Sequence, residues 1–154
     1  MTRLFARAEG GERAIGKVPR GLRGNISVIG TIGLRGVLPY FSIPGSVDGL
    51  VFNTFIEKLL IPALKPNDVV IMDRLKVHLS ASVEKLINNV GAKVIPLPSS
   101  SPELNPIENC ISKVKECLRS IEARTIDALI DALNLAFDSV SLEDIKHWFA
   151  FCGY

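Results

Sequence analysis

The feature that most constrains this fold is a strand, helix and strand pattern between residues 68 and 97. Residues 68–73 form a short apolar run that ends in a carboxylate, which is typical of a strand buried on both faces. Ser80 then begins a segment with helical apolar spacing, and Gly91 ends it. Residues 93–97 return as a second strand. Two strands joined by one helix are expected to lie parallel.

The flanking segments complete an α/β fold with a helical C-terminal part. Residues 25–32 and 37–43 are short, β-branched and bounded by glycine, so they predict an antiparallel hairpin. Residues 48–60 predict a helix that Pro62 and Pro66 end. Three more helices are expected, with predicted starts at Asn105-Pro106, Thr125 and Ser141. The predicted core-facing residues of the second of these are Ile126, Leu129, Ile130, Leu133 and Phe137.

The net charge of the whole chain indicates little about function, whereas the charge of one segment is informative. The chain has 18 Lys and Arg against 16 Asp and Glu, and a net charge of +2 is too small to indicate nucleic acid by itself. Residues 1–24, however, contain six Lys or Arg and two Glu. Such a segment can contact phosphates, or it can be a solvated chain end. We therefore separate a basic, Gly/Arg-rich lead-in over residues 1–24 from one domain over residues 25–154.

Cysteine use and hydropathy indicate a cytoplasmic protein. Cys110, Cys117 and Cys152 form no Cys-x-x-Cys pair, and they are odd in number. They predict buried thiols in a reducing compartment, not a disulfide framework or a zinc site. No secretory signal is evident, and no apolar run approaches the roughly 20 residues that span a bilayer, so no membrane partner is expected.

Two carboxylates stand where metal-dependent phosphoryl transfer needs them. Asp73 ends its strand, and ligands of open α/β sheets bind outside the carboxyl ends of parallel strands. Glu108 follows after 34 intervening residues, which hold one helix, one strand and one loop. The chain can therefore return Glu108 to the same end of the sheet. Clustered carboxylates bind Mg²⁺. Two such ions can stabilise both the attacking and the leaving oxygen of a phosphodiester transfer. A third carboxylate is normally expected in such a site.

Each of these residues also has a structural interpretation. Asp73 could cap the turn after its strand. With Asn105 as N-cap and Pro106 at the first helical position, Glu108 falls at the capping-box position. His78, five residues after Asp73, is a candidate contact for DNA or substrate, although a single histidine is more often structural. From the pattern alone both interpretations stay open.

Longer motifs surround these residues. They are Asp-Arg-Leu-Lys-Val-His (73–78), a segment over 91–108 that ends Ser-Pro-Glu-Leu-Asn-Pro-Ile-Glu, and Lys-Val-Lys (113–115). They resemble the mariner-like superfamily of DDE transposases, in particular those of bacterial insertion sequences. The family pattern is Asp-Asn-x-x-x-His, then Leu-Pro-x-Tyr-Ser-Pro-(Asp/Glu)-Leu-Asn-Pro-Ile-Glu. Residues 7–24 and the closing Phe-Cys-Gly-Tyr are also similar, so the resemblance covers nearly the whole chain.

The resemblance implies an RNase H-like mixed sheet with flanking helices. It implies that Asp73 and Glu108 are the second and third catalytic acids and hold Mg²⁺ or Mn²⁺, with His78 and Asn105 supporting the site. It also implies DNA as the partner, cleavage at element ends, 3′-hydroxyl strand transfer, and a DNA-associated protein of the bacterial cytoplasm. The candidate DNA contacts are Arg20, Arg23, Arg74, Lys113 and Lys115.

The sequence departs from the family at the presumed site. No acidic residue before Asp73 fits the first catalytic Asp, since Glu9 and Glu12 lie in the Gly/Arg-rich segment and Asp48 starts a helix. Arg74 replaces the usual Asn, and Ser99-Ser100 stands where Pro-Tyr is usual.

These departures predict a partial RNase H-like domain over residues 25–154 that lacks the first core strand and an upstream helix-turn-helix. The unpaired edges must then pair with each other, with another chain or with water. We expect weak Mg²⁺ binding and no DNA cleavage by this chain alone. Activity would require an upstream transposase segment, joined by frameshifting or by complementation, and a homodimer is a further expectation. The alternatives are a non-catalytic remnant that binds DNA or interferes with full-length transposase, and a decayed gene without function.

Overall fold

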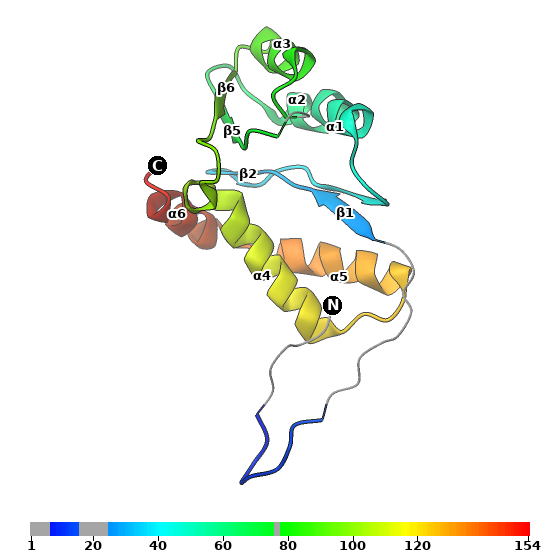
Figure 1. The fold of residues 1–154 in the computed structure, drawn as a ribbon. Coiled ribbons are helices and arrows are strands. Elements are labelled where there is room, and N and C mark those ends of the chain that lie inside the picture. The colour runs from blue at the N-terminus through cyan, green and yellow to red at the C-terminus, as the bar shows by residue number, and fades with distance from the viewer. Residues whose placement is uncertain (1–6, 16–24, 76–77) are drawn as a thin grey trace.

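In the part of the chain that the structure describes, the strands form three two-stranded ladders and not one continuous sheet. The computed structural model describes residues 7–15, 25–75 and 78–154. The antiparallel pairs are β1 (Ile26–Ile29) with β4 (Phe41–Pro44), and β2 (Ile32–Gly33) with β3 (Gly36–Val37). The parallel pair is β5 (Val69–Met72) with β6 (Lys93–Pro96). Figure 1 shows β1 and β2 between an upper group that holds α1, α2, α3, β5 and β6 and a lower group that holds α4, α5 and α6.

The predicted hairpin is confirmed, but it is interrupted in the middle. Gly33 pairs with Gly36 across a tight turn, and Gly36 has a φ of 133°, a conformation that favours glycine. Beyond this turn the ladder stops, because Pro39 has no N–H to donate. The Leu38 N–H still donates to the Thr31 carbonyl at 3.0 Å, which holds the two short ladders in one hairpin.

The predicted strand, helix and strand unit is also confirmed. β5 and β6 are parallel in the register Val69 to Lys93 and Met72 to Pro96. Between them, helix α3 (Ala81–Asn89) begins where the Ser80 side chain accepts a hydrogen bond from the backbone of Val83. The helix ends before Gly91, whose φ of 77° allows the reversal into β6.

The prediction that Pro62 ends the preceding helix is wrong. Helix α1 (Gly49–Phe55) starts at Asp48, whose carboxylate accepts from the Val51 amide at 2.9 Å. The helix continues through the π-helical segment η1 (Ile56–Leu60) into the short helix α2 (Ile61–Ala63). Pro62 lies in the first turn of α2, where a missing N–H is tolerated. The helix therefore extends past Pro62 and ends at Ala63.

The last third contains a short 3₁₀ turn, η2 (Pro102–Leu104), and three helices. The helices are α4 (Pro106–Ile121), α5 (Ile126–Asp138) and α6 (Leu142–Phe151). Their predicted starts are confirmed: the Thr125 hydroxyl accepts from the Ala128 amide, and Ser141 forms a full capping box with Asp144. Cys110 and Cys152 are buried as predicted, whereas Cys117 is half-buried.

The buried residues divide into two cores. One lies between α1, η1, α3 and β5 and is built around Ile56, Val83 and Ile87. The other lies between α4, α5 and the hairpin, where Tyr40 stacks on Phe137 with 4.1 Å between ring centroids. In the part of the chain that the structure describes, no helix has both the length and the apolar character of a membrane span.

The predicted inner face of α5 is partly wrong. Leu133 and Phe137 are buried as expected, but Ile126 and Ile130 are 46% and 37% exposed. Ala132 and Ala136 lie in the core instead. The hairpin packs against the C-terminal half of α5 through Tyr40, and small side chains there allow that close approach.

We predict that Phe137→Ala destabilises the protein by about 3–5 kcal/mol, because it leaves a cavity in the core between α5 and the hairpin. Phe137 is 2% exposed. Urea denaturation followed by circular dichroism measures the change. The control is Phe151→Ala, whose side chain is 71% exposed and should change the free energy of unfolding by less than about 0.5 kcal/mol. Equal losses in both variants would contradict this account of the core.

Candidate active site

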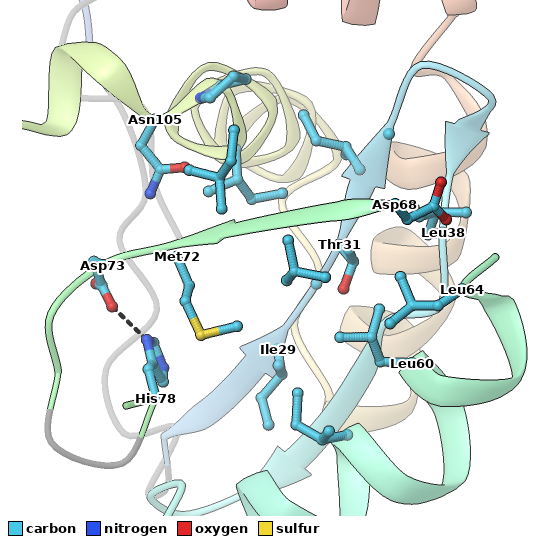
Figure 2. Close-up of a pocket in the computed structure, with 18 of the residues that line it drawn as sticks. Ile29, Thr31, Leu38, Leu60, Leu64, Asp68, Met72, Asp73, His78 and Asn105 are labelled. Atoms are coloured by element: carbon cyan, nitrogen blue, oxygen red, sulfur yellow. Dashed lines mark hydrogen bonds and ion pairs between the residues drawn. The ribbon is translucent and has the colours of Figure 1, made fainter. Parts of the chain in front are cut away.

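A cavity of about 610 Å³ lies between the hairpin and β5 (Figure 2). The hairpin forms one wall and β5 forms another, and α1, η1 and the start of α4 contribute the remaining lining. At one end of this cavity the lining residues are Asp73, His78, Asn105 and Glu108. A smaller adjoining cavity of about 290 Å³ is lined by Asp73, Arg74, Asn105, Glu108 and the loop that follows β6. The two predicted carboxylates thus share both cavities.

Asp73 is placed by the end of β5 and contacted by His78. The residue follows Met72 directly, so its backbone leaves the strand at the carboxyl end. His78 Nδ1 contacts Asp73 Oδ1, and the His78 ring stacks on Phe52 with 4.3 Å between centroids. An ionised carboxylate only accepts hydrogen bonds, so in this contact Nδ1–H is the donor. The imidazole, which is held against Phe52, therefore restricts the orientation of the Asp73 carboxylate. The alternative role of Asp73 as a cap of the turn after its strand stays a prediction.

Glu108 is placed by the first turn of α4, and its carboxylate is not used as a cap. The Glu108 amide donates to the Asn105 carbonyl at 3.0 Å, which forms the first turn of the helix. The Asn105 side chain makes no capping hydrogen bond, unlike Ser141 in the capping box of α6. Among the described residues no hydrogen bond joins the Glu108 side chain to the Asn105 amide. The capping-box interpretation of Glu108 is therefore wrong, and its exposed carboxylate faces the shared cavities.

Asn105 also lies at this end of the cavity. The residue is only 9% exposed, and its amide N–H donates to the Pro102 carbonyl at 3.0 Å. Figure 2 shows its side chain at the same end as Asp73 and His78. The 3₁₀ turn that ends at Leu104 therefore fixes the entry into α4, and with it the direction of Glu108.

The opposite end of the cavity is lined by an ion pair that the sequence did not predict. Arg35 donates two hydrogen bonds to Asp68, at 3.1 and 2.7 Å. The hydrogen bond from the Arg35 guanidinium, together with one from the Lys65 amide, lowers the pKa of Asp68 below its usual value. The pair joins the tip of the hairpin to the start of β5. Because the partners are 33 positions apart in the sequence, no local sequence signal indicates this contact.

Among the predicted DNA contacts that the structure describes, one lies at the site. Arg74 lines the smaller cavity, and its Nε donates to the Leu97 carbonyl at 3.0 Å. Lys113 instead donates to Asp144 at 2.5 Å and joins α4 to α6. Lys115 is exposed on α4 and lines neither cavity. Arg20 and Arg23 lie outside the described residues.

The candidate ligands at the site suit a hard divalent cation, although they are few. Asp73 and Glu108 present carboxylate oxygens, the ligands that Mg²⁺ prefers. In residues 7–15, 25–75 and 78–154, no group of three or more His, Cys, Asp or Glu side chains is arranged to hold a metal ion. The side chains described here therefore supply two acidic ligands at most.

One family model and several solved structures match this chain. The family model described as DDE superfamily endonuclease matches residues 1–130. The chain belongs to the DDE superfamily of endonucleases. The DDE superfamily predicted from the motifs around Asp73 and Glu108 is thereby confirmed, and the bacterial insertion-sequence type stays a prediction. No curated protein matches the sequence.

Solved structures of Mos1 transposase share the fold of this DDE superfamily member. The Mos1 strand transfer complex has a TM-score of 0.73 at 16% identity and covers 99% of this chain and 51% of that chain. The paired-end complex with the left transposon end has a TM-score of 0.76 at 13% identity, covering 97% and 47%. The Mos1 catalytic domain with Raltegravir and Mg has a TM-score of 0.64 at 14% identity, covering 84% and 78%.

This chain spans about half the length of the first two Mos1 chains. The likeness confirms the predicted RNase H-like fold. Among the described residues the strands are divided between a part with β1 and a part with β5, and the larger cavity lies between the two parts. The division arises because β1 pairs with β4 alone and β5 pairs with β6 alone.

The ion pair between α4 and α6 makes stability depend on acid pH. Hydrogen bonds from Lys113 and then from Ser141 lower the pKa of Asp144 from 3.8 to about 2. A carboxylate whose pKa is lowered by folding stabilises the protein above its unfolded pKa, and this contribution is lost as the pH falls through the folded pKa.

We predict that Asp144→Asn lowers Tm most above about pH 4, and that the Tm difference from the wild type shrinks as the pH falls toward about 2. Thermal unfolding between these pH values measures the difference. Asp131→Asn, an exposed substitution in the middle of α5, is the control and should follow the wild-type profile. A Tm difference for Asp144→Asn that is independent of pH would contradict the role of this ion pair.

Proposed function

We propose that this chain acts in metal-dependent DNA transposition, with Asp73 and Glu108 as ligands of the catalytic divalent ions. The observation that carries the proposal is that both carboxylates line the same two cavities at the carboxyl end of β5. The chain belongs to the DDE superfamily of endonucleases, and this membership supports a role for the two carboxylates in DNA cleavage. Support for a DNA substrate comes from the matched Mos1 structures, which are a strand transfer complex and a paired-end complex with a transposon end.

The cofactor proposed is Mg²⁺ or Mn²⁺. Mos1 structures with Mn and with Mg are among those that share this fold. Asp73 and Glu108 would hold the ions, and bound ions supply an activated attacking oxygen and neutralise charge on the phosphodiester. Every ligand offered by this pair is a carboxylate oxygen, which suits a hard cation.

The surrounding residues orient the acids and the DNA. His78, stacked on Phe52, holds the Asp73 carboxylate in one direction. Asn105 fixes the start of α4 and therefore the position of Glu108. Arg74, anchored through Nε to the Leu97 carbonyl, retains further N–H donors with which to contact a DNA phosphate beside the smaller cavity. In this proposal Arg74 takes the DNA-contact role, and Lys113 has a structural role in joining α4 to α6.

Metal binding tests this assignment without requiring catalysis. We expect Mn²⁺ to bind weakly to the wild-type chain, and Asp73→Asn and Glu108→Gln each to weaken binding at least about 10-fold, because each removes one of two ionic ligands. Electron paramagnetic resonance of free Mn²⁺ measures the occupancy.

The matched control for metal binding is Glu103→Gln, in the 3₁₀ turn that precedes α4. Glu103 is exposed and lines neither cavity, so its substitution should leave Mn²⁺ binding unchanged. Equal binding by the wild type and by both site variants would refute the proposed site. A loss of binding in Glu103→Gln as large as in Glu108→Gln would show that the effect is one of general surface charge.

We further predict that the purified chain does not nick DNA in the presence of Mg²⁺. The two acids described here are fewer than two-metal phosphoryl transfer normally uses, so the second ion lacks a ligand. Conversion of supercoiled plasmid to its nicked form measures the activity. Mg²⁺-dependent nicking that Asp73→Ala abolishes would contradict this prediction and would show that two carboxylates suffice.

A further inference from the structure

Tyr154, which follows α6, contacts the turn that leads into α4. Its hydroxyl donates to the Leu104 carbonyl at 2.9 Å, and the two residues are 50 positions apart in the sequence. Leu104 is the last residue of η2, and Asn105 follows it into α4. In Figure 1 the end of α6 accordingly lies beside the start of α4. The entry into the helix that carries Glu108 is therefore held by a side chain from another element.

The end of α6 directs Tyr154 towards this turn. The Tyr154 amide donates to the Phe149 carbonyl at 2.9 Å. The Gly153 amide donates to the Ala150 carbonyl at 3.1 Å, and Gly153 has a φ of 89°. These two hydrogen bonds and the left-handed glycine form a Schellman motif. The apolar contact typical of this motif is also present, because the Tyr154 ring meets the Phe149 ring edge-on with 6.1 Å between centroids.

The Leu104 carbonyl depends on this donor. Among the described residues no backbone amide donates to it, because the Glu108 amide, four residues further on, donates to the Asn105 carbonyl instead. Partial burial raises the pKa of the Tyr154 phenol above its usual value, and the neighbouring Cys152 raises it further. The phenol is therefore protonated at neutral pH and serves as the donor.

Two other contacts hold the body of α4 to α6. Asn109 Nδ2 lies 4.0 Å from the Cys152 thiol, and Lys113 pairs with Asp144 one turn later. Both of these contacts are made from within the helix, whereas the bond from Tyr154 holds the backbone before the helix begins. Loss of the Tyr154 hydroxyl alone should therefore leave α4 packed against α6 and give freedom only to its first turn.

We propose that Tyr154 is a positioning residue for the metal site and acts on Glu108 through the Leu104 carbonyl. This inference rests on the proposed function, in which Asp73 and Glu108 together hold the divalent ions. The two carboxylates are positioned by different cores, so their separation depends on where α4 begins. Residues that orient metal ligands without touching the metal commonly have a large effect on metal affinity.

Mn²⁺ binding by Tyr154→Phe tests the proposal. The variant keeps the ring against Phe149 and removes only the hydroxyl that donates to Leu104. We expect the Kd for Mn²⁺ to rise about 5-fold, which corresponds to the loss of one hydrogen bond. Electron paramagnetic resonance of free Mn²⁺ at neutral pH measures the Kd. An unchanged Kd would overturn the proposal.

The other tyrosine of the chain provides a matched control. Tyr40 donates one hydrogen bond, to Asn134 at 2.6 Å, in the core between α5 and the hairpin, and it lines neither cavity. Tyr40→Phe removes the same chemical group away from the site and should leave the Kd for Mn²⁺ unchanged.

A second control separates metal binding from general stability. Asp144→Asn breaks the ion pair between α4 and α6 further along the helix, so it should lower Tm and retain the wild-type Kd for Mn²⁺. A rise in Kd in this variant or in Tyr40→Phe as large as that in Tyr154→Phe would show general loosening and would overturn the proposal.

A double-mutant cycle shows whether Tyr154 acts through Glu108. In a chain that already carries Glu108→Gln, the carboxylate to be positioned is absent, so Tyr154→Phe should weaken Mn²⁺ binding no further. In a chain that carries Asp73→Asn, Tyr154→Phe should still raise the Kd about 5-fold. Losses that are additive with Glu108→Gln would rule out the route through Glu108.

The same series separates this inference from the proposed function. If Glu108→Gln weakens Mn²⁺ binding and Tyr154→Phe does not, the proposed metal site stands and the role of Tyr154 is refuted. If the wild type and Glu108→Gln bind Mn²⁺ equally, the proposed site fails and the positioning role fails with it. Circular dichroism at the temperature of measurement verifies that each variant is folded. An unfolded Tyr154→Phe would show that the hydroxyl serves global stability and would also refute the positioning role.

Discussion

The site depends first on β5, which is paired on one side only. Val70 and Met72 are each 9% exposed and belong to the core with α1, η1 and α3. Because side chains alternate along a strand, a shift of one residue would move this pair out of the core. The parallel ladder with β6 and the packing of Val70 and Met72 therefore determine where the strand ends, and Asp73 occupies that position. The same strand borders the larger cavity with its other edge.

The second carboxylate, that of Glu108, is positioned by the other core. Glu108 begins a helix whose buried face packs against α5 and the hairpin, and Lys113 joins that helix to α6. Asp73 and Glu108 are thus held by two groups of elements that meet across the cavity. The ion pair between Arg35 and Asp68 is one described contact that joins the groups at the far end. The distance between the carboxylates is consequently set by tertiary contacts on either side of an open space.

Short-range signals in the sequence predicted the starts of the helices, because these starts depend on contacts between residues close in sequence. Asp48, Ser80, Thr125 and Ser141 cap helices as expected, because a short polar side chain satisfies amides within three residues of itself. The return of Glu108 to Asp73 was also predictable, since a helix between parallel strands has few possible paths. The contact between Arg35 and Asp68 and the stacking of His78 on Phe52 were not, because each joins segments distant in sequence.

The division of the sheet and the position of Asp73 both depend on β5. A central strand has hydrogen-bonding partners on both sides, and β5 has the continuous apolar sequence of such a strand with a partner on one side among the described residues. The unpaired edge and the Asp73 carboxylate belong to the same short segment of backbone. The packing that fixes β5 in the core therefore also fixes the position of the Asp73 carboxylate at the site.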